Sequence, residues 1–332
     1  MRHAPGGGRK GRNGMSRKKG AMAPAWNGSG RRHALRVMWM DRMFYLMLLP
    51  GLVYFIVFHY APMYGVQIAF RNYRMKLGFF GSPWVGMENF ERLFRDPGFI
   101  TALKNTVIIS LLKIAVGFTA PIVLALMLNA VRSARLRRVF QSISYLPHFL
   151  SWIVIASLAR SMFSTSMGSV NQLIQRFGFE PVNFLGSSQH FRGVLVLSDC
   201  WKEVGWGSII YLAALMGVDR QLYEAATVDG ARPFRQLISI TIPSIAPTII
   251  TMLILRVGGI LSAGQEQVYA MYNELVYSVA DILDTYALRV GLNNLKYSMS
   301  TAVSLFKSAI GLTMILITNR ISKLLDENNG IF

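Results

Sequence analysis

The sequence predicts an all-α membrane protein with about six transmembrane helices. Of the 332 residues, 52% are hydrophobic and only 15% are charged, whereas about a quarter of the residues in an ordinary soluble domain are charged. Several apolar runs of about 20 residues are long enough to cross a bilayer as helices. The chain has a formal net charge of +19, and many basic residues gather between the apolar runs. These features favour a multispanning membrane protein over a soluble domain.

The first 36 residues are rich in Gly, Arg, Lys and Ser and almost free of large apolar side chains. We predict that residues 1–36 form a disordered basic tail and that residues 37–332 form the membrane domain. Residues 1–42 contain eleven Lys and Arg residues and one acidic residue, Asp41. Directly before a membrane span, this charge indicates a cytoplasmic location and contact with anionic lipid rather than nucleic acid. A cleaved signal peptide is disfavoured, because the next apolar run is too long and lacks a small-x-small site.

Six apolar runs are expected to form the transmembrane helices. We place them at about residues 43–60, 103–128, 139–163, 193–218, 243–263 and 298–318. Pro50 can kink the first helix and Pro147 interrupts the third, which neighbouring helices tolerate in a bilayer. The connection 264–297, with four acidic residues, is expected to be an outer segment.

Basic residues indicate how the helices are oriented. The short connection Asn129–Arg138 holds four Arg residues and no acidic residue, which marks it as cytoplasmic. With both termini in the cytoplasm, the inner segments carry 20 Lys and Arg residues and the outer segments carry nine. The first outer loop alone contains five of those nine, so it fits this orientation least well.

The polar stretch Tyr223–Pro247, YEAATVDGARPFRQLISITIPSIAP, lies between the fourth and fifth predicted helices. Connections between membrane helices are usually featureless, but this one has two helical patterns around a glycine. Ala and Glu favour helix, and Gly230 is placed to end a first short helix. Phe234, Leu237 and Ile238 then recur at helical spacing. We therefore predict a compact unit of two short helices that is followed by a membrane helix.

This stretch resembles the EAA signature of the permease subunits of binding-protein-dependent ABC importers. The signature is EAA, three residues, G, nine residues and I-x-L-P, and Ile242 stands where Leu is usual. In that family the segment is a coupling helix that seats in a cleft of a cytoplasmic ATPase. The resemblance implies a coupling loop over 219–243 with these ATPase-coupling residues: Glu224, Ala225, Ala226, Gly230, Ala231, Ile240 and Pro243.

Other stretches look like the LplB-like branch of carbohydrate permeases. They are Met47–Phe70, Gly81–Phe90, Ile143–Trp152, Trp201–Leu215, Asp284–Asn294 and Lys296–Leu312. The resemblance implies a type I ABC importer permease fold in the bacterial cytoplasmic membrane, and translocation of oligosaccharides or polysaccharide fragments by alternating access. It also implies a cytoplasmic ABC ATPase dimer that uses ATP and Mg, a second EAA-motif permease and an extracytoplasmic solute-binding protein.

No catalytic motif accompanies this pattern. The sequence has no G-x-x-x-x-G-K-[ST] loop, no H-E-x-x-H or H-x-x-x-H pair and no G-x-S-x-G elbow, so we expect a transport subunit without a cofactor or metal of its own. The single cysteine, Cys200, excludes an intramolecular disulfide. A self-sufficient secondary transporter of small solutes and a membrane enzyme remain as alternatives; the first requires an ion site and inverted repeats, which are not evident.

Glu224 has two interpretations that do not exclude each other. A carboxylate near the start of a short helix complements the helix dipole. It also suits a salt bridge with an Arg residue of a partner, or with Arg220 or Arg235 of this chain.

Charged residues within the predicted membrane helices are the second candidate site, because unpaired charge in hydrocarbon costs about 2.5 kcal/mol or more. Lys202 can pair with Asp199, three residues before it on the same helix. It can neutralise only one of Asp199 and Glu203 well, so Arg256 or Lys307 is expected to partner the other carboxylate. Such residues either form ion pairs inside the bundle or line a polar path for sugar hydroxyls. Lys113, Arg256 and Lys307 suit an acidic sugar if they face that path. The candidate path residues are Asp199, Trp201, Lys202, Glu203, Trp206, Arg256 and Lys307, although aromatic residues near helix ends are often interface anchors.

Overall fold

The computed structural model describes residues 41–325 of the chain. The predicted tail, residues 1–36, lies outside the described residues. Within residues 41–325 the secondary structure is helical, apart from one isolated β-bridge between Arg71 and Trp84. The chain divides into two compact units, residues 1–64 and 65–332, which are described separately.

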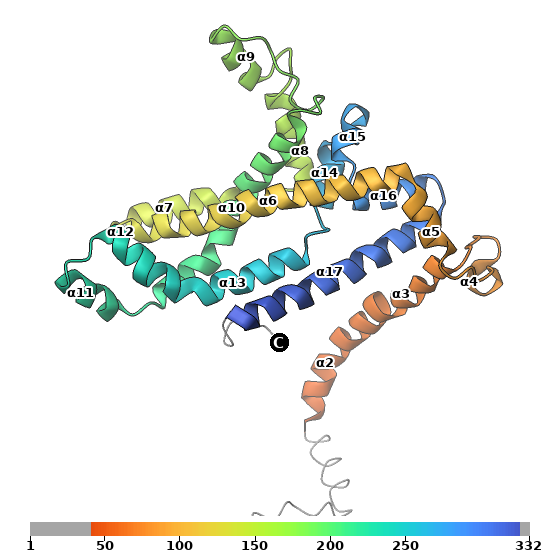
Figure 1. The fold of residues 1–332 in the computed structure, drawn as a ribbon, viewed down its shortest axis with the longest axis horizontal. Coiled ribbons are helices and arrows are strands. Elements are labelled where there is room, and N and C mark those ends of the chain that lie inside the picture. The colour runs from red at the N-terminus through yellow and green to blue at the C-terminus, as the bar shows by residue number, and fades with distance from the viewer. Residues whose placement is uncertain (1–40, 326–332) are drawn as a thin grey trace, which may run out of the picture. The chain divides into compact units, whose positions relative to one another are not determined.

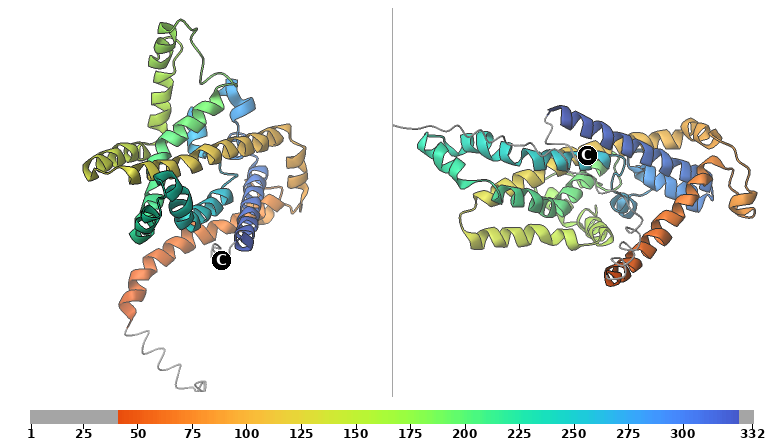
Figure 2. Two further views of the ribbon diagram at one scale, coloured as in Figure 1. Left: turned by 60° about the vertical axis from the view of Figure 1, so that its left-hand side comes forward. Right: turned by 90° about the horizontal axis from the view of Figure 1, so that it is seen from below.

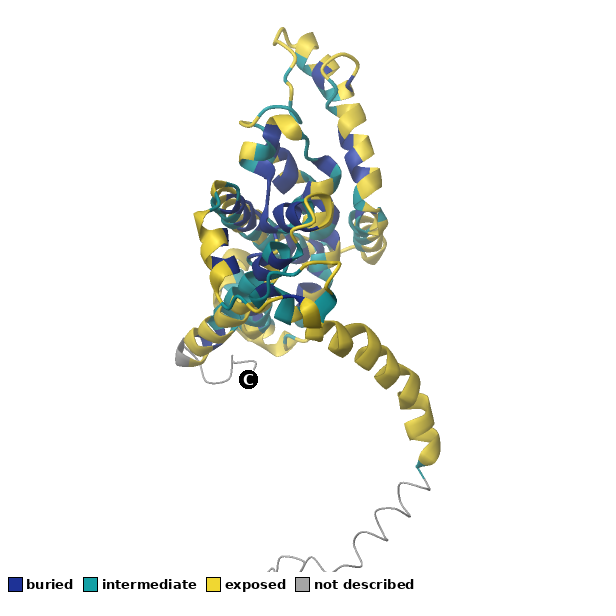
Figure 3. Ribbon diagram, turned by 90° about the vertical axis from the view of Figure 1, so that its right-hand side faces the viewer, coloured by how far each residue is buried: buried dark blue, intermediate teal, exposed yellow. Residues whose placement is uncertain are grey.

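The described part of the first unit is one helical run, α2 (Arg42–Phe55), the π-helical turn η1 (Ile56–Tyr60) and α3 (Ala61–Met63). It confirms the first predicted helix, which continues through Pro50. Every residue from 42 to 64 is exposed, as Figure 3 shows by its colour. An apolar helix with no buried face suits a lipid or protein environment rather than water.

The second unit is organised around α6 (Pro97–Ala130) and α10 (Phe191–Met216), which make the most extensive contact between any two helices and cross each other in Figures 1 and 2. Asp96 caps α6 by accepting a hydrogen bond from the Gly98 amide at 2.7 Å, and Pro97 occupies the first helical position, where no backbone donor is needed. Gly205 allows α10 to approach α7 (Ala134–Tyr145) closely, since a Cβ there would lie 1.9 Å from the Ser144 carbonyl oxygen.

The third predicted helix is bent in two. Helices α7 (Ala134–Tyr145) and α8 (Trp152–Met162) are joined through η3 (Leu146–Phe149) and meet at an angle of 99°. Pro147 lacks the amide donor that a continuous helix needs, and Ser151 caps the restart by accepting from the Val154 amide at 3.3 Å. The helix changes to 3-10 geometry around Pro147, but the bend itself lies at Leu150 and Ser151, after the predicted break. The element also begins at Ala134 and is not one straight span over 139–163.

The C-terminal half contains α13 (Ile242–Gly258) and α17 (Tyr297–Leu325), which pack together. Helix α13 continues an unbroken helical run that begins with α12 (Pro233–Gln236) and the π turn η4 (Leu237–Thr241). The predicted fifth and sixth membrane helices are therefore present, and the fifth starts ten residues earlier than the sequence indicated. In Figure 1, α11 (Arg220–Val228) and α12 lie at one end of this unit, away from α5 (Glu88–Arg95) and α16.

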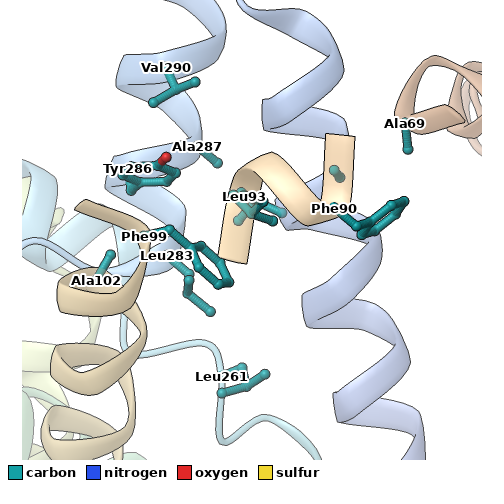
Figure 4. Packing of buried hydrophobic residues seen from close by; sticks show 12 residues of the cluster. Ala69, Phe90, Leu93, Phe99, Ala102, Leu261, Leu283, Tyr286, Ala287 and Val290 are labelled. Atoms are coloured by element: carbon teal, nitrogen blue, oxygen red, sulfur yellow. The ribbon is translucent and has the colours of Figure 1, made fainter. Parts of the chain in front are cut away.

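Residues 264–296, which were expected to form an outer segment, are folded into helices and not an open loop. They form five short helical elements: α14 (Gln265–Met271), η5 (Glu274–Val276), α15 (Tyr277–Ala280), α16 (Leu283–Leu288) and η6 (Arg289–Asn293). Much of this segment is buried, and Leu283 and Tyr286 of α16 pack against Phe99 of α6 and Leu93 of α5 (Figure 4). The segment is part of the core because its polar side chains find partners inside the protein, as described below.

Four helices in residues 41–325 are long and apolar enough to cross a membrane, and the bent pair α7–α8 makes a fifth if it counts as one span. The four are Arg42–Phe70, Pro97–Ala130, Pro233–Gly258 and Tyr297–Lys323. Helix α10 has 26 residues, about 39 Å at 1.5 Å per residue, but it carries Asp199, Lys202 and Glu203. Its length supports the fourth predicted helix, residues 193–218, and its charges separate it from the apolar helices.

Candidate functional site

The first candidate site is the coupling loop, residues 219–243, whose first helix is α11. Asp219 caps its start by accepting a hydrogen bond from the Gln221 amide at 2.9 Å. At its end, the Ala231 amide donates to the Ala226 carbonyl at 2.8 Å and the Gly230 amide donates to the Thr227 carbonyl at 3.1 Å. Gly230 has φ of +74°, and this pair of bonds around a left-handed glycine is a Schellman cap. Gly230 therefore ends the first helix, as its position in the sequence predicts.

The second half of the coupling loop is not a separate helix, contrary to the prediction. The chain is helical without a break from Pro233 to Gly258, so Pro243 lies within this run and not at a junction. Proline cannot donate to the carbonyl four residues earlier, and the π turn η4 directly before it shows how the helix accommodates this. The run thus connects the loop to the membrane region as one rod.

Side-chain bonds hold the two halves of the coupling loop together. The hydroxyls of Tyr223 and Thr241 are 2.9 Å apart, which links α11 to η4. Gln236 Nε2 donates to Thr227 Oγ1 and to the Ala231 carbonyl, each at 3.0 Å. The loop encloses a hollow of about 850 Å³, whose lining includes four of the motif residues: Ala226, Gly230, Ala231 and Ile240.

Glu224 behaves differently from the expectation. It is the fifth residue of α11 rather than one of its first, so it lies beyond the turn where the helix dipole acts strongly. It is exposed, and within residues 41–325 no ion pair joins it to Arg220 or Arg235. The predicted intramolecular salt bridge is therefore absent among the described residues, and the carboxylate is accessible.

The second candidate site contains an ion cluster formed by Lys113, Asp199 and Arg256, which come from α6, α10 and α13. Lys113 Nζ is 3.1 Å from one Asp199 oxygen, and Arg256 Nη2 is 3.9 Å from the other. Lys113 also donates to the Ala263 carbonyl at 2.8 Å and to the Gln267 side chain. Arg256 is therefore the partner of one of the two α10 carboxylates, Asp199, as expected.

Of the two α10 carboxylates, Lys202 lies near Glu203 and not near Asp199. Its side chain is buried, donates to the His148 carbonyl and lies 3.5 Å from Glu203. Glu203 is also 2.9 Å from His148 Nδ1, and the His148 ring stacks on Trp206 with centroids 4.5 Å apart. Three path residues, Lys202, Glu203 and Trp206, thus attach α10 to the break between α7 and α8.

The remaining two path residues lie elsewhere. Lys307 Nζ is 2.6 Å from Asp284, so it joins α17 to α16 and does not partner an α10 carboxylate. Trp201 lines an apolar hollow of about 620 Å³ between α8 and α10, together with Ile155 and Leu158. The seven residues therefore do not line one common cavity within the described chain. Lys113, which is not one of the seven, lies with Asp199 and Arg256 in the structure. Its charge within an apolar run was the signal that could have placed it among the candidate residues.

Residues 264–296 are fixed next to these sites by polar contacts. Arg289 holds Asp281 with two hydrogen bonds of 3.0 and 2.5 Å, and Tyr286 donates to Asp96 at 2.7 Å. Burial raises the pKa of Tyr286 above its ordinary value, and the hydrogen bond to Asp96 adds to the effect. Burial also raises the pKa of Tyr272 to about 12. Both phenols are therefore neutral at physiological pH, and Tyr286 remains a donor.

Long apolar helices with buried ion pairs between them are typical of an integral membrane protein. The chain belongs to the family of binding-protein-dependent transport system inner membrane components, whose family model matches residues 117–329. It is 46% identical to Protein LplB of Bacillus subtilis strain 168, over 88% of this chain and 92% of that protein. It is 44% identical to the polygalacturonan/rhamnogalacturonan transport system permease protein YteP of the same organism, over 91% of this chain and 94% of that protein.

Solved structures agree with this assignment. A chain of a bacterial ABC transporter involved in the import of the acidic polysaccharide alginate superposes with a TM-score of 0.82, at 38% identity, over 89% of this chain and 99% of that chain. A chain of bacterial alginate ABC transporter in complex with alginate pentasaccharide-bound periplasmic protein gives 0.81, at 39% identity, over 87% and 97%. The protein therefore has the type I permease fold and is a permease subunit of an ABC importer, a transport component rather than an enzyme.

Proposed function

We propose that this permease subunit translocates oligosaccharides or polysaccharide fragments into the cell by alternating access. The observation that carries the substrate class is the likeness to YteP and to the alginate transporter, each over more than four fifths of the chain. The substrate is delivered by an extracytoplasmic solute-binding protein. The permease domain, residues 37–332, crosses the bacterial cytoplasmic membrane, with both termini in the cytoplasm.

The coupling loop is proposed to contact one subunit of a cytoplasmic ABC ATPase dimer, which binds ATP and Mg. The accessible Glu224 carboxylate supports this role because it has no ion pair within the described chain and is available to a basic residue of a partner. The continuous helix from Pro233 to Gly258 supports a mechanical role, since movement of the loop would be transmitted along one rod into the membrane. The contact set comprises Glu224, Ala225, Ala226, Gly230, Ala231, Ile240 and Pro243.

A second EAA-motif permease is proposed to complete the translocation path. The exposed apolar surface of α2, where every residue is exposed, and the cavity beside the ion cluster support a path completed by further protein. A self-sufficient secondary transporter would instead need all of its path and its energy source within this chain.

The test is affinity purification of the tagged chain from its native membrane in mild detergent, with mass spectrometry of its companions. Recovery of a P-loop ATPase, a second EAA-bearing permease and a secreted binding protein is expected. In proteoliposomes containing these subunits, saccharide uptake should require ATP and survive collapse of ion gradients. Uptake by the chain alone that follows an ion gradient would contradict the proposal and favour the secondary transporter.

Orientation has its own test, because single cysteines introduced at Ser187 and Arg235 should be labelled from opposite sides of the membrane. Cys200 is first replaced by Ala, so that only the introduced thiol reacts. Labelling of both positions from the same side would contradict the six-helix orientation.

A further inference from the structure

Arg256 lines a cavity of about 280 Å³ in the second unit, between α6, α10 and α13. This volume is close to the lower limit for ligand pockets, which measure about 300–1,000 Å³. The cavity can therefore hold one sugar residue of a longer chain. The other lining residues include Ser110, Lys113, Asp199, Gly259 and Ser262. Both the ion cluster and polar hydroxyl groups therefore face the same space.

The ion cluster leaves one positive charge uncompensated. Asp199 supplies one negative charge to two cations, Lys113 and Arg256. The Lys113 ammonium has three N–H donors, and three acceptors surround it: Asp199, the Ala263 carbonyl and Gln267. Glu203, the next acidic group along α10, is satisfied by Lys202 and His148. The surplus charge therefore resides on Arg256.

The Arg256 guanidinium is available for a ligand. Its side chain is 42% exposed and lies no closer than 3.9 Å to Asp199, and no hydrogen bond within residues 41–325 uses its five N–H donors. A planar guanidinium forms two parallel hydrogen bonds with a carboxylate. An ionised side chain within a membrane helix is costly and marks a functional path when it faces a polar cavity.

Two further features of the cavity support a ligand. Ser110 Oγ is buried without a hydrogen-bond partner, and Ser110 lines the cavity, where a sugar hydroxyl would satisfy it. Gly117 leaves space for the guanidinium, since a Cβ there would lie 2.9 Å from Arg256 Nη2. The site thus combines a cation, an unsatisfied hydroxyl and space.

We propose that Arg256 binds a carboxylate of the translocated saccharide, so that the substrate is an acidic, uronate-containing oligosaccharide. This inference rests on the proposed function and specifies its substrate class. Lys113 neutralises Asp199, which would otherwise repel the substrate, and Arg256 provides the positive charge that the passing carboxylate contacts.

The experiment uses the complete importer in proteoliposomes with ATP. Uptake of a galacturonate pentasaccharide is compared with uptake of its carboxyl-reduced counterpart of the same length, for wild type and Arg256→Gln. Loss of a hydrogen-bonded charge contact should lower the ratio of acidic to neutral uptake by about tenfold or more. Arg256→Lys should restore part of the ratio, because it keeps the charge without the fork.

Two further variants separate substrate contact from structural damage. Gly117→Ala keeps Arg256 but displaces its guanidinium, and should lower the same ratio. The matched control is Arg160→Gln on α8, which removes an equal charge outside the cavity and should leave the ratio unchanged.

ATP-driven uptake with an unchanged ratio in Arg256→Gln, whether or not both rates fall, would overturn the inference alone. A wild-type importer that prefers the carboxyl-reduced oligosaccharide would overturn it as well. Absence of ATP-driven uptake of either saccharide would overturn the proposed function together with the inference.

Discussion

The coupling loop and the ion cluster differ in where their stabilising contacts come from. Within the loop, the cap at Gly230 and the bond between Tyr223 and Thr241 join residues that are close in sequence. In the ion cluster, Lys113, Asp199 and Arg256 are brought together from three helices. The loop is therefore a local structure on an accessible surface, whereas the cluster exists only when the bundle is assembled.

Substitutions in the two regions should therefore have separable effects on stability and on transport. Groups buried in the bundle are costly to leave unpaired, so a change in the cluster should affect the whole fold. Exposed groups of the loop contribute little to folding, so a change there should affect coupling first. The following variants test this separation, from the largest expected effect on stability to the smallest.

Lys113→Met should have the largest effect, because it leaves the Asp199 carboxylate buried with only Arg256 nearby. We expect a loss of about 3 kcal/mol in the free energy of unfolding, the lower end of the cost of breaking a buried ion pair. The measurement is thermal unfolding of the purified importer in detergent. Lys104→Met is the matched control, because Lys104 is exposed on the same helix.

The double variant Lys113→Met with Asp199→Asn sharpens this test. Removing the stranded charge should recover part of the stability that Lys113→Met loses. Equal unfolding temperatures for Lys113→Met and Lys104→Met would show that the cluster does not stabilise the bundle.

Gly230→Val should have an intermediate effect confined to the coupling loop. A β-branched residue at φ of +74° is strained by about 1–2 kcal/mol, which should open the end of α11. ATP-driven uptake is expected to be lost while the chain remains in the membrane and the bundle unfolds at nearly the wild-type temperature. The control is Gly217→Ala, since a Cβ at Gly217 would approach no closer than 3.4 Å to its nearest neighbour. Retention of full uptake by Gly230→Val would remove this turn from the coupling mechanism.

Tyr286→Phe should weaken the buried segment 264–296 by about 1 kcal/mol, the net contribution of a typical hydrogen bond. The raised pKa of Tyr286 makes this effect depend on pH. In the folded state the pKa of the Tyr286 phenol lies above its ordinary value of 10.0. Its contribution to the stability of the fold is therefore complete below pH 10.0 and is lost as the pH rises further.

Unfolding measured at neutral pH and above pH 10.0 should therefore show a difference between wild type and Tyr286→Phe that narrows at the higher pH. Tyr269→Phe, which alters an exposed phenol, should show neither the loss nor its pH dependence. A constant difference across this pH range would contradict the role of the Tyr286 hydroxyl.

Sequence reasoning succeeded where the determining contacts are local. Glycine at position 230 predicts the end of a helix because few other residues adopt a left-handed backbone there. The long apolar runs also predict membrane helices from local sequence, because the length and composition of one continuous run are enough. The family resemblance then specified the fold, which the comparison with solved structures confirms.

Sequence reasoning failed where the interacting residues lie far apart in the chain. The polar residues between 264 and 297 gave no sign of burial, but Gln267 is fully buried and donates to the Leu195 carbonyl at 2.8 Å. Lys202 was considered as a partner for Asp199 because the two are close on one helix, yet Lys113 and Arg256 from two other helices are the partners of Asp199. Such pairings depend on how helices cross, which spacing along a single chain does not specify.

Glu224→Ala should have the smallest effect on stability, within about 0.5 kcal/mol, because Glu224 is exposed and without an ion pair in the described chain. Its effect on transport should nevertheless be severe, since the carboxylate is proposed to bind a basic residue of the ATPase. The measurement pairs thermal unfolding with copurification of the ATPase and uptake, using Glu180→Ala as an exposed acidic control outside the loop. Loss of uptake and of ATPase binding at wild-type stability would separate the two regions completely. Normal uptake would instead show that the local structure of the loop, and not this charge, mediates coupling.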